Sequence, residues 1–182
     1  MLIAVLVALC VVLIYGIVLV NGLYALRRQT QHALGQIDLQ RKRRCDAVPK
    51  LVEIVKGDLS GEQETLEKLM QARSQALNAH TVIGKASAEN LLHRSIDSVL
   101  ALTQGHPDLE VSDDLISTRE ALRAAQNKIA FASQYYNDVA NKYNLRLESF
   151  PSSLWASVGR FAPIDLFEVD GTIQREAVKA HI

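Results

Sequence analysis

The chain has few of the residues that interrupt helices. Only four prolines and nine glycines occur among its 182 residues, and these two residue types disfavour helix interiors most strongly. We find no stretch with the apolar and polar alternation of a half-buried strand. These absences together predict an all-α fold with long helices.

Cysteine and net charge are also scarce. The two cysteines, Cys10 and Cys45, stand in an apolar run and on a helical face, and they have no zinc-site spacing. We expect two free, buried thiols. Twenty basic and twenty acidic residues cancel, so overall charge does not favour a nucleic-acid partner.

Signatures of catalysis are missing as well. The sequence contains no phosphate-binding loop, dinucleotide fingerprint or Gly-x-Ser-x-Gly elbow. A di-iron bundle needs two inward-facing Glu-x-x-His pairs; Glu89 and His93 are spaced by four, and no second pair exists. We therefore expect no enzyme activity, no cofactor and no metal. The histidines occur singly and are expected on the surface: His32, His80, His93, His106 and His181.

What the chain has in quantity is a long apolar run at its start. Met1–Val20 carries no charged side chain, and twenty helical residues span about 30 Å, the thickness of a bilayer core. A cleaved signal peptide is the competing interpretation. A signal peptide has basic residues before the apolar run and a small-residue cleavage site after it, and neither is present. We expect an uncleaved single-span anchor over residues 1–22.

Charges beside the anchor predict its orientation. Arg27 and Arg28 follow the apolar run, and a basic stretch extends from Arg41 to Arg44. Positive flanking segments stay on the cytoplasmic side. The N-terminus is therefore expected outside and the rest of the chain in the cytoplasm.

Beyond the anchor, apolar residues recur at helical spacing in four segments. No proline occurs before Pro49, so the anchor can run directly into the first helix, which should kink near Cys45. Further helices are expected over residues 62–78, 86–103 and from Ser112 or Asp113 to about 149. Short links between amphipathic helices favour an antiparallel four-helix bundle over residues 23–150. The remaining residues, 151–182, are expected to form an irregular tail.

Two arginines fall on the apolar face of the first bundle helix. Arg41 lies at the centre of this face and Arg44 near its edge, whereas Lys42 and Arg43 point outward, so the basic run does not form one patch for nucleic acid or anionic lipid. If the first and last helices are antiparallel neighbours, the arginines lie level with residues near 135–141. We expect a structural polar cluster of Asp38, Arg41, Arg44, Asn137 and Asp138, in which Asn141 is a further acceptor.

Aromatic residues gather in the tail. Trp155, Phe161 and Phe167 follow Phe150-Pro151 within a short segment, which the antiparallel arrangement returns towards the anchor. They are candidates for an interface. Either they cover the membrane-proximal end of the bundle, or some of them also enter the bilayer interface, where tryptophan is favoured.

Several motifs resemble those of the LemA family of bacterial, membrane-anchored helical proteins. They are QIDLQRKRRCDAVPKLVEIVKG (36–57), ETLEKLMQARSQA (64–76), HPDL (106–109) and NKIAFASQYYNDVANKYN (127–144). The family pattern often has an acidic residue near Gln126, an arginine near Ser133 and an asparagine where this chain has Lys50, so polar contacts there are expected to differ. The resemblance implies architecture and a place in the bacterial cytoplasmic membrane rather than a reaction.

Two functions follow from these expectations. The first is a non-catalytic, membrane-anchored scaffold or adaptor that binds other proteins and organises membrane or envelope complexes. The alternative is an accessory or regulatory subunit of an envelope enzyme complex, such as a protease. The sequence leaves the partner and the oligomeric state open.

Overall fold

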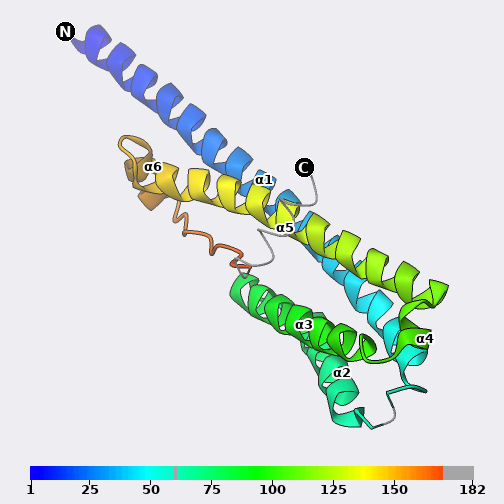
Figure 1. Ribbon diagram of the computed structural model, residues 1–182. Coiled ribbons are helices and arrows are strands. Elements are labelled where there is room, and N and C mark those ends of the chain that lie inside the picture. The colour runs from blue at the N-terminus through cyan, green and yellow to red at the C-terminus, as the bar shows by residue number, and fades with distance from the viewer. Residues whose placement is uncertain (60, 170–182) are drawn as a thin grey trace. The chain divides into compact units, whose positions relative to one another are not determined.

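The computed structural model describes residues 1–59 and 61–169, and its ordered elements are all helices (Figure 1). Within these residues there is no β-strand, which confirms the all-α prediction. The elements are α1 (Leu2–Val55), α2 (Gln63–Asn78), α3 (Val82–Thr103), α4 (Pro107–Glu110), α5 (Asp113–Glu148) and α6 (Ser152–Val158).

The helix boundaries follow local signals. As expected, α1 continues from the apolar run into the first helix of the bundle; it also includes Pro49, and the kink predicted near Cys45 stays a prediction. Helix α3 begins four residues earlier than expected because Thr81 caps it: the Thr81 hydroxyl accepts a hydrogen bond from the Gly84 N–H at 3.1 Å. The turn at HPDL forms the single-turn helix α4, with Pro107 at its start.

The chain forms two compact units, and both α1 and α5 contribute to each of them. The first unit comprises Met1–Ala33 and Tyr135–Leu166, and the second comprises Leu34–Gln134 and Phe167–Ile182. Residues 170–182 of the second unit lie outside the described residues. The two units group residues by their contacts in space. The predicted domains, 1–22, 23–150 and 151–182, divide the chain along its sequence instead.

In the first unit, α1 and the end of α5 run antiparallel. Gln29 Nε2 donates to the Tyr135 hydroxyl at 2.6 Å, and the Arg146 guanidinium lies beside Gly22. Higher residue numbers on α5 thus meet lower numbers on α1. The small core of this unit joins both helices to α6 and the segment after it, through Leu23, Leu26, Tyr143, Leu147, Ala156, Phe161 and Ile164.

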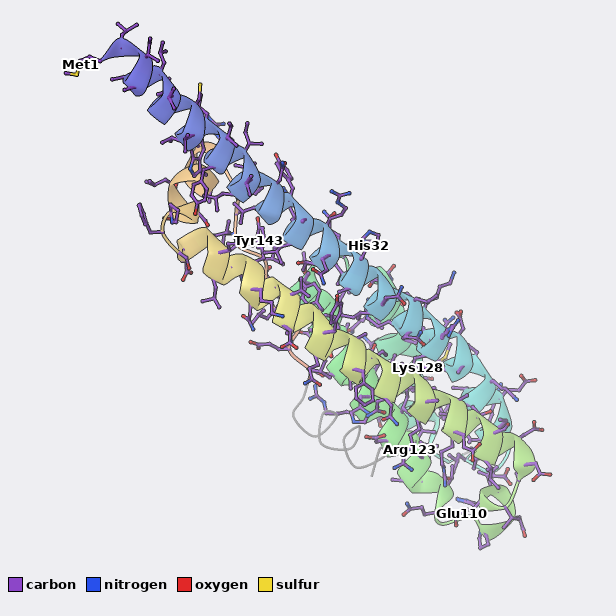
Figure 2. The ribbon with its side chains drawn as sticks, turned by 90° about the horizontal axis from the view of Figure 1, so that it is seen from above. Met1, His32, Glu110, Arg123, Lys128 and Tyr143 are labelled. Atoms are coloured by element: carbon purple, nitrogen blue, oxygen red, sulfur yellow. The ribbon has the colours of Figure 1, made fainter. Side chains whose placement is uncertain are left out.

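The start of α1 exposes its apolar side chains. Leu2 is 77% exposed and Ile17 is still 60% exposed, and Figure 2 shows side chains projecting from the helix beside Met1. By length and composition, α1 is a candidate membrane-spanning helix. A core helix of a soluble domain would bury such residues.

The second unit has a conventional aliphatic core. Helices α2 and α3 pack along each other and are joined by the short link Ala79–Thr81. The end of α1 and the start of α5 also meet here, where Lys50 Nζ lies 3.7 Å from Asp114 Oδ1. The largest fully buried aliphatic residues of this core are Leu51, Leu59, Leu69, Leu92, Ile96 and Leu115.

Candidate functional site

The most unusual feature of the second unit is a buried charged cluster centred on α1. Arg41 is 5% exposed and Arg44 only 1%, whereas Lys42 and Arg43 between them are exposed. Helical periodicity explains the pattern, because residues three apart share a face. The two inward arginines thus lie where the sequence predicts, and each needs an acceptor.

Glu89 of α3 is the central acceptor. Its side chain is completely buried, and its Oε1 accepts a hydrogen bond from Arg44 Nη1. Its other oxygen, Oε2, faces Arg41 Nε at 3.6 Å. One buried carboxylate therefore serves two buried guanidinium groups, and its loss would leave Arg44 without a carboxylate partner and Arg41 with Asp38 alone.

His93 and Gln126 complete the surroundings of Arg44. Arg44 Nη2 lies 3.2 Å from both His93 Nδ1 and Gln126 Oε1. On its other side, His93 Nε2 lies 3.3 Å from Asp97 Oδ2 and 3.3 Å from Gln126 Nε2. His93 Nδ1 thus faces a guanidinium group, and its Nε2 faces a carboxylate and an amide nitrogen.

Arg41 is held at the edge of the cluster by Asp38 and α2. Its Nη1 donates to Asp38 Oδ1 at 3.2 Å, the local contact expected from the sequence, and its Nη2 donates to the Ala76 carbonyl at 2.7 Å. The other Asp38 oxygen accepts from Lys85 Nζ of α3 at 2.6 Å. Polar contacts thus join α1 to both α2 and α3.

The acceptors differ from those expected. We expected Asn137 and Asp138 to join Asp38, Arg41 and Arg44; the recorded cluster instead contains Glu89 and Gln126. Asn137 is half-buried and Asp138 exposed, both in the α5 segment of the first unit. The expected alignment of α5 along α1 was offset, since Gln126 rather than a residue near 135 meets Arg44.

His93 also corrects the expectation that the histidines lie on the surface. It is 7% exposed, whereas His32 and His80 are exposed. The four-residue spacing of Glu89 and His93 was the available signal, because it places both on one helical face. As a metal motif the pair has the wrong spacing, and in the structure both side chains instead contact Arg44.

Pro49 creates a second polar contact between α1 and α2. Proline has no N–H, so the carbonyl four residues earlier, that of Cys45, loses its helical donor. Arg73 Nε of α2 replaces that donor at 2.7 Å. A residue predicted to disturb the helix therefore exposes an acceptor that an arginine on the neighbouring helix uses.

Cys45 lies beside these charges as a free, buried thiol, and Cys10 is free but exposed along the apolar run. Burial, reinforced by the nearby Glu89 carboxylate, raises the pKa of the Cys45 thiol to about 11, against the opposing effect of the nearby arginines. The thiol is therefore protonated at neutral pH, which makes it a weak nucleophile.

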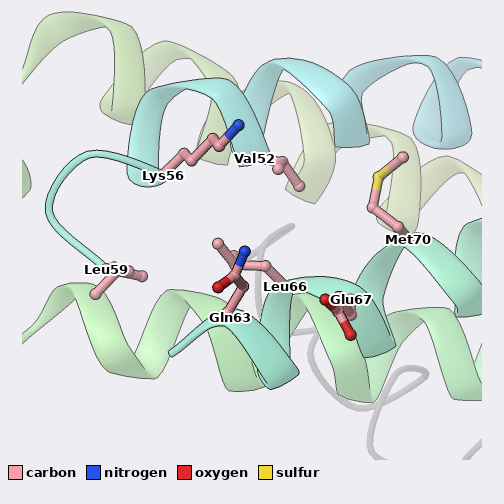
Figure 3. A pocket seen from close by; sticks show the side chains of 7 residues that line it. All are labelled: Val52, Lys56, Leu59, Gln63, Leu66, Glu67 and Met70. Atoms are coloured by element: carbon pink, nitrogen blue, oxygen red, sulfur yellow. The ribbon is translucent and has the colours of Figure 1, made fainter. Parts of the chain in front are cut away.

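Cavities open on the described part of the second unit. One, of about 300 Å³, lies against the charged cluster and is lined by Asp38, Arg41, Lys42, Cys45, Ala76, Leu77, Ala79, His80 and Lys85. Another, of about 400 Å³, is mostly apolar; in Figure 3, Val52 of α1 and Leu66 of α2 lie on opposite sides of it. Its remaining lining residues are Lys56, Leu59, Gln63, Glu67 and Met70.

The three aromatic residues of the tail have different surroundings. Trp155, on α6, packs against Gly16 of α1. The Phe161 ring meets the Tyr24 ring edge to face, with centroids 5.0 Å apart. Phe167 is completely buried and belongs to the second unit. The tail is also less irregular than expected, since α6 forms within it.

The cluster holds its charges against one another. Among the described residues, no group of three or more His, Cys, Asp or Glu side chains is placed to bind a metal ion. The acidic and basic side chains are bonded between α1 and α3, and burial raises the pKa of the cysteine thiol beside them. Such an arrangement fixes how helices pack.

The comparisons with known proteins identify a family and no individual relative. The model of the LemA family matches residues 33–181, most of the chain. No curated protein matches the sequence. The matched range begins beyond the apolar run and includes every residue of the charged cluster.

Proposed function

The chain belongs to the LemA family, and on that premise we propose that it is a single-pass protein of the bacterial cytoplasmic membrane. Its N-terminus lies outside, and an antiparallel four-helix bundle lies in the cytoplasm. The bundle acts as a non-catalytic scaffold or adaptor that binds other proteins.

The exposure of the apolar run is the observation that carries the anchor. Side chains from Leu2 to Val18 are mostly more than half exposed, although no charge interrupts the run. A surface of this kind is favourable in hydrocarbon and unfavourable in water. The contact between Gly16 and Trp155 also supports retention of the segment, because cleavage as a signal peptide would remove a packing partner.

The charged cluster supports the scaffold role. The Glu89 carboxylate lies between Arg41 and Arg44 and joins α3 to α1, and Gln126 adds α5. Buried ion pairs favour one particular helix arrangement over alternatives, as polar groups do in coiled coils. A bundle fixed in this way presents a constant surface to partners, and it leaves none of these charged groups available as a free acid or base.

Topology is the first test of the proposal. Fusions after Ile182 to a reporter that works only outside the cytoplasm should be inactive, and fusions to a cytoplasmic reporter should be active. The same two fusions are then made to a variant with Arg27 and Arg28 both changed to glutamine. If flanking positive charge sets the orientation, this variant should be inserted less uniformly. Reporter activity outside the cytoplasm in the unchanged protein would overturn the proposed orientation.

Partner analysis tests the scaffold role against the alternative. The full-length protein is purified in mild detergent, and its stoichiometric partners are identified by mass spectrometry. A scaffold should bind partners without altering their turnover. If a bound protease or another envelope enzyme changes its rate when the purified protein is added back, the accessory-subunit role replaces the scaffold role.

A further inference from the structure

Helix α6 leaves an apolar face uncovered. Leu154 and Val158 are 60% and 79% exposed and lie four residues apart, so they share one face of the helix. Phe150, just before α6, is 81% exposed. The opposite face is packed, because Ser152 and Ala156 are buried. Exposed large apolar groups clustered on one short helix indicate a contact surface.

The position of α6 along α1 identifies what this surface meets. Three atoms of the Trp155 indole lie 2.3–2.6 Å from the point where a Cβ on Gly16 would stand, so the ring packs directly on that glycine. Gly16 is four residues inside the apolar run that ends at Val20, which is about 6 Å along the helix. Helix α6 therefore lies alongside the apolar segment (Figure 1).

The apolar start of α1 and the α6 segment contain no charged residues, and charged residues lie beyond them along the chain. Residues 1–20 and 149–159 carry none. The nearest charged residues along the chain are arginines and one glutamate, and the Arg146 guanidinium lies beside Gly22, just past the end of the apolar run. An uncharged apolar zone next to a basic rim is the pattern of a segment seated at the boundary between acyl chains and headgroups.

We propose that α6 is a second membrane element, a short helix whose Phe150, Leu154 and Val158 side chains enter the lipid interface beside the anchor. The depth of about 6 Å agrees with the roughly 5–10 Å to which interfacial helices bury their apolar face. This inference rests on the proposed membrane anchor. It extends the tail hypothesis by assigning lipid contact to the outer face of α6, while Trp155 fixes α6 against α1.

Tryptophan relocation tests this assignment in the full-length protein reconstituted in liposomes. The variant Trp155→Phe/Leu154→Trp places the only tryptophan on the outer face of α6, and Trp155→Phe/Val158→Trp repeats the test at a second exposed position. The control, Trp155→Phe/Tyr135→Trp, has its tryptophan on the 50%-exposed site opposite Gln29, past the apolar run. Each variant is measured with ordinary lipids and with lipids brominated in the upper acyl chains.

Bromine should quench the two α6 variants at least about twofold more than the control, because only the α6 positions lie at interfacial depth. Equal quenching in all three variants, or aqueous acrylamide reaching all three equally, would overturn the proposal. Blue-shifted emission without bromine quenching would also overturn it, because another protein surface would then cover α6. Failure of the protein to enter liposomes would instead contradict the anchor itself, so the two failures are distinguishable.

Discussion

The two units of the chain differ in what they bury and what they expose. The second unit buries charge: Arg44 and Glu89 are almost entirely removed from solvent and bonded to each other. The first unit exposes apolar surface, on the start of α1 and on α6. One of its internal hydrogen bonds joins neutral groups: the Tyr136 hydroxyl donates to the Asp165 carbonyl at 2.7 Å.

The difference between the units lies in the kind of side chain that each one buries. Buried charges are costly unless paired, so they restrict the second unit to one arrangement of helices. Apolar side chains gain nothing from helix contact in lipid, where close packing at small residues matters instead. Gly16 under Trp155 is such a contact. We therefore expect the stability of the second unit to depend on its buried ion pairs, and the stability of the first unit to depend on the close fit of its side chains.

Glu89→Gln should have the largest effect. It keeps the shape of the side chain but leaves the Arg41 and Arg44 charges without their buried carboxylate, which should lower the free energy of unfolding by about 3–5 kcal/mol. Urea unfolding of the full-length protein in mild detergent, followed by circular dichroism, measures this. The control is Glu120→Gln at an exposed site on α5, where we expect little change.

The same experiment can separate pairing from burial. The double variant Arg44→Met/Glu89→Leu removes both charges, so it should be more stable than Glu89→Leu alone. A loss below about 1 kcal/mol for Glu89→Gln would mean that water reaches the cluster. That result would remove the contrast between the two units.

Gly16→Leu tests the dependence of the first unit on shape. The added side chain would overlap the Trp155 indole, because even a Cβ would stand 2.3 Å from it. Overpacking should cost about 1–3 kcal/mol and displace α6. We expect faster tryptic cleavage after Arg160, which is exposed just beyond α6. Gly35→Leu is the matched control, because nothing lies within 4 Å of that position; equal cleavage rates in both variants would contradict the contact.

Arg73→Met should have a smaller effect, about 1–2 kcal/mol, because it leaves the Cys45 carbonyl without its donor. The effect should shrink in a Pro49→Ala background, since alanine restores the N–H that the Cys45 carbonyl lacks. Unfolding of both single variants and the double variant gives the coupling. Strict additivity would show that Arg73 and Pro49 act independently.

The smallest change in stability is expected for substitution of Cys45, and it should be seen only at alkaline pH. Its folded pKa, about 11, lies above the ordinary value of 9.0, so its contribution to stability is complete below 9 and is lost as the pH rises towards 11. Thiol labelling in a Cys10→Ser background should be slow in the folded protein and fast in denaturant. A Cys45→Ala variant should lose this part of the alkaline instability, and rapid labelling at neutral pH would contradict the burial.

The sequence by itself determined the helices and the candidate membrane-spanning segment. Periodicity places Arg41 and Arg44 inward and Lys42 outward because a helix repeats every 3.6 residues, and the structure confirms each position. The apolar run is evident from composition alone. Capping and breaking residues gave the ends of α2 and α5 to within a residue or two because those signals are local.

Only the tertiary structure decided which groups meet the arginines. Glu89 lies 45 residues from Arg44 and Gln126 lies 82 residues away. Their meeting depends on how far each helix is shifted along its neighbours, which the apolar spacing of a single helix does not specify. The predicted alignment sets the arginines level with residues near 135–141, and a shift of α5 by a few turns brings Gln126 to Arg44 in place of Asn137 and Asp138. The sequence thus required buried partners for two arginines, and the long-range packing of the helices selected them.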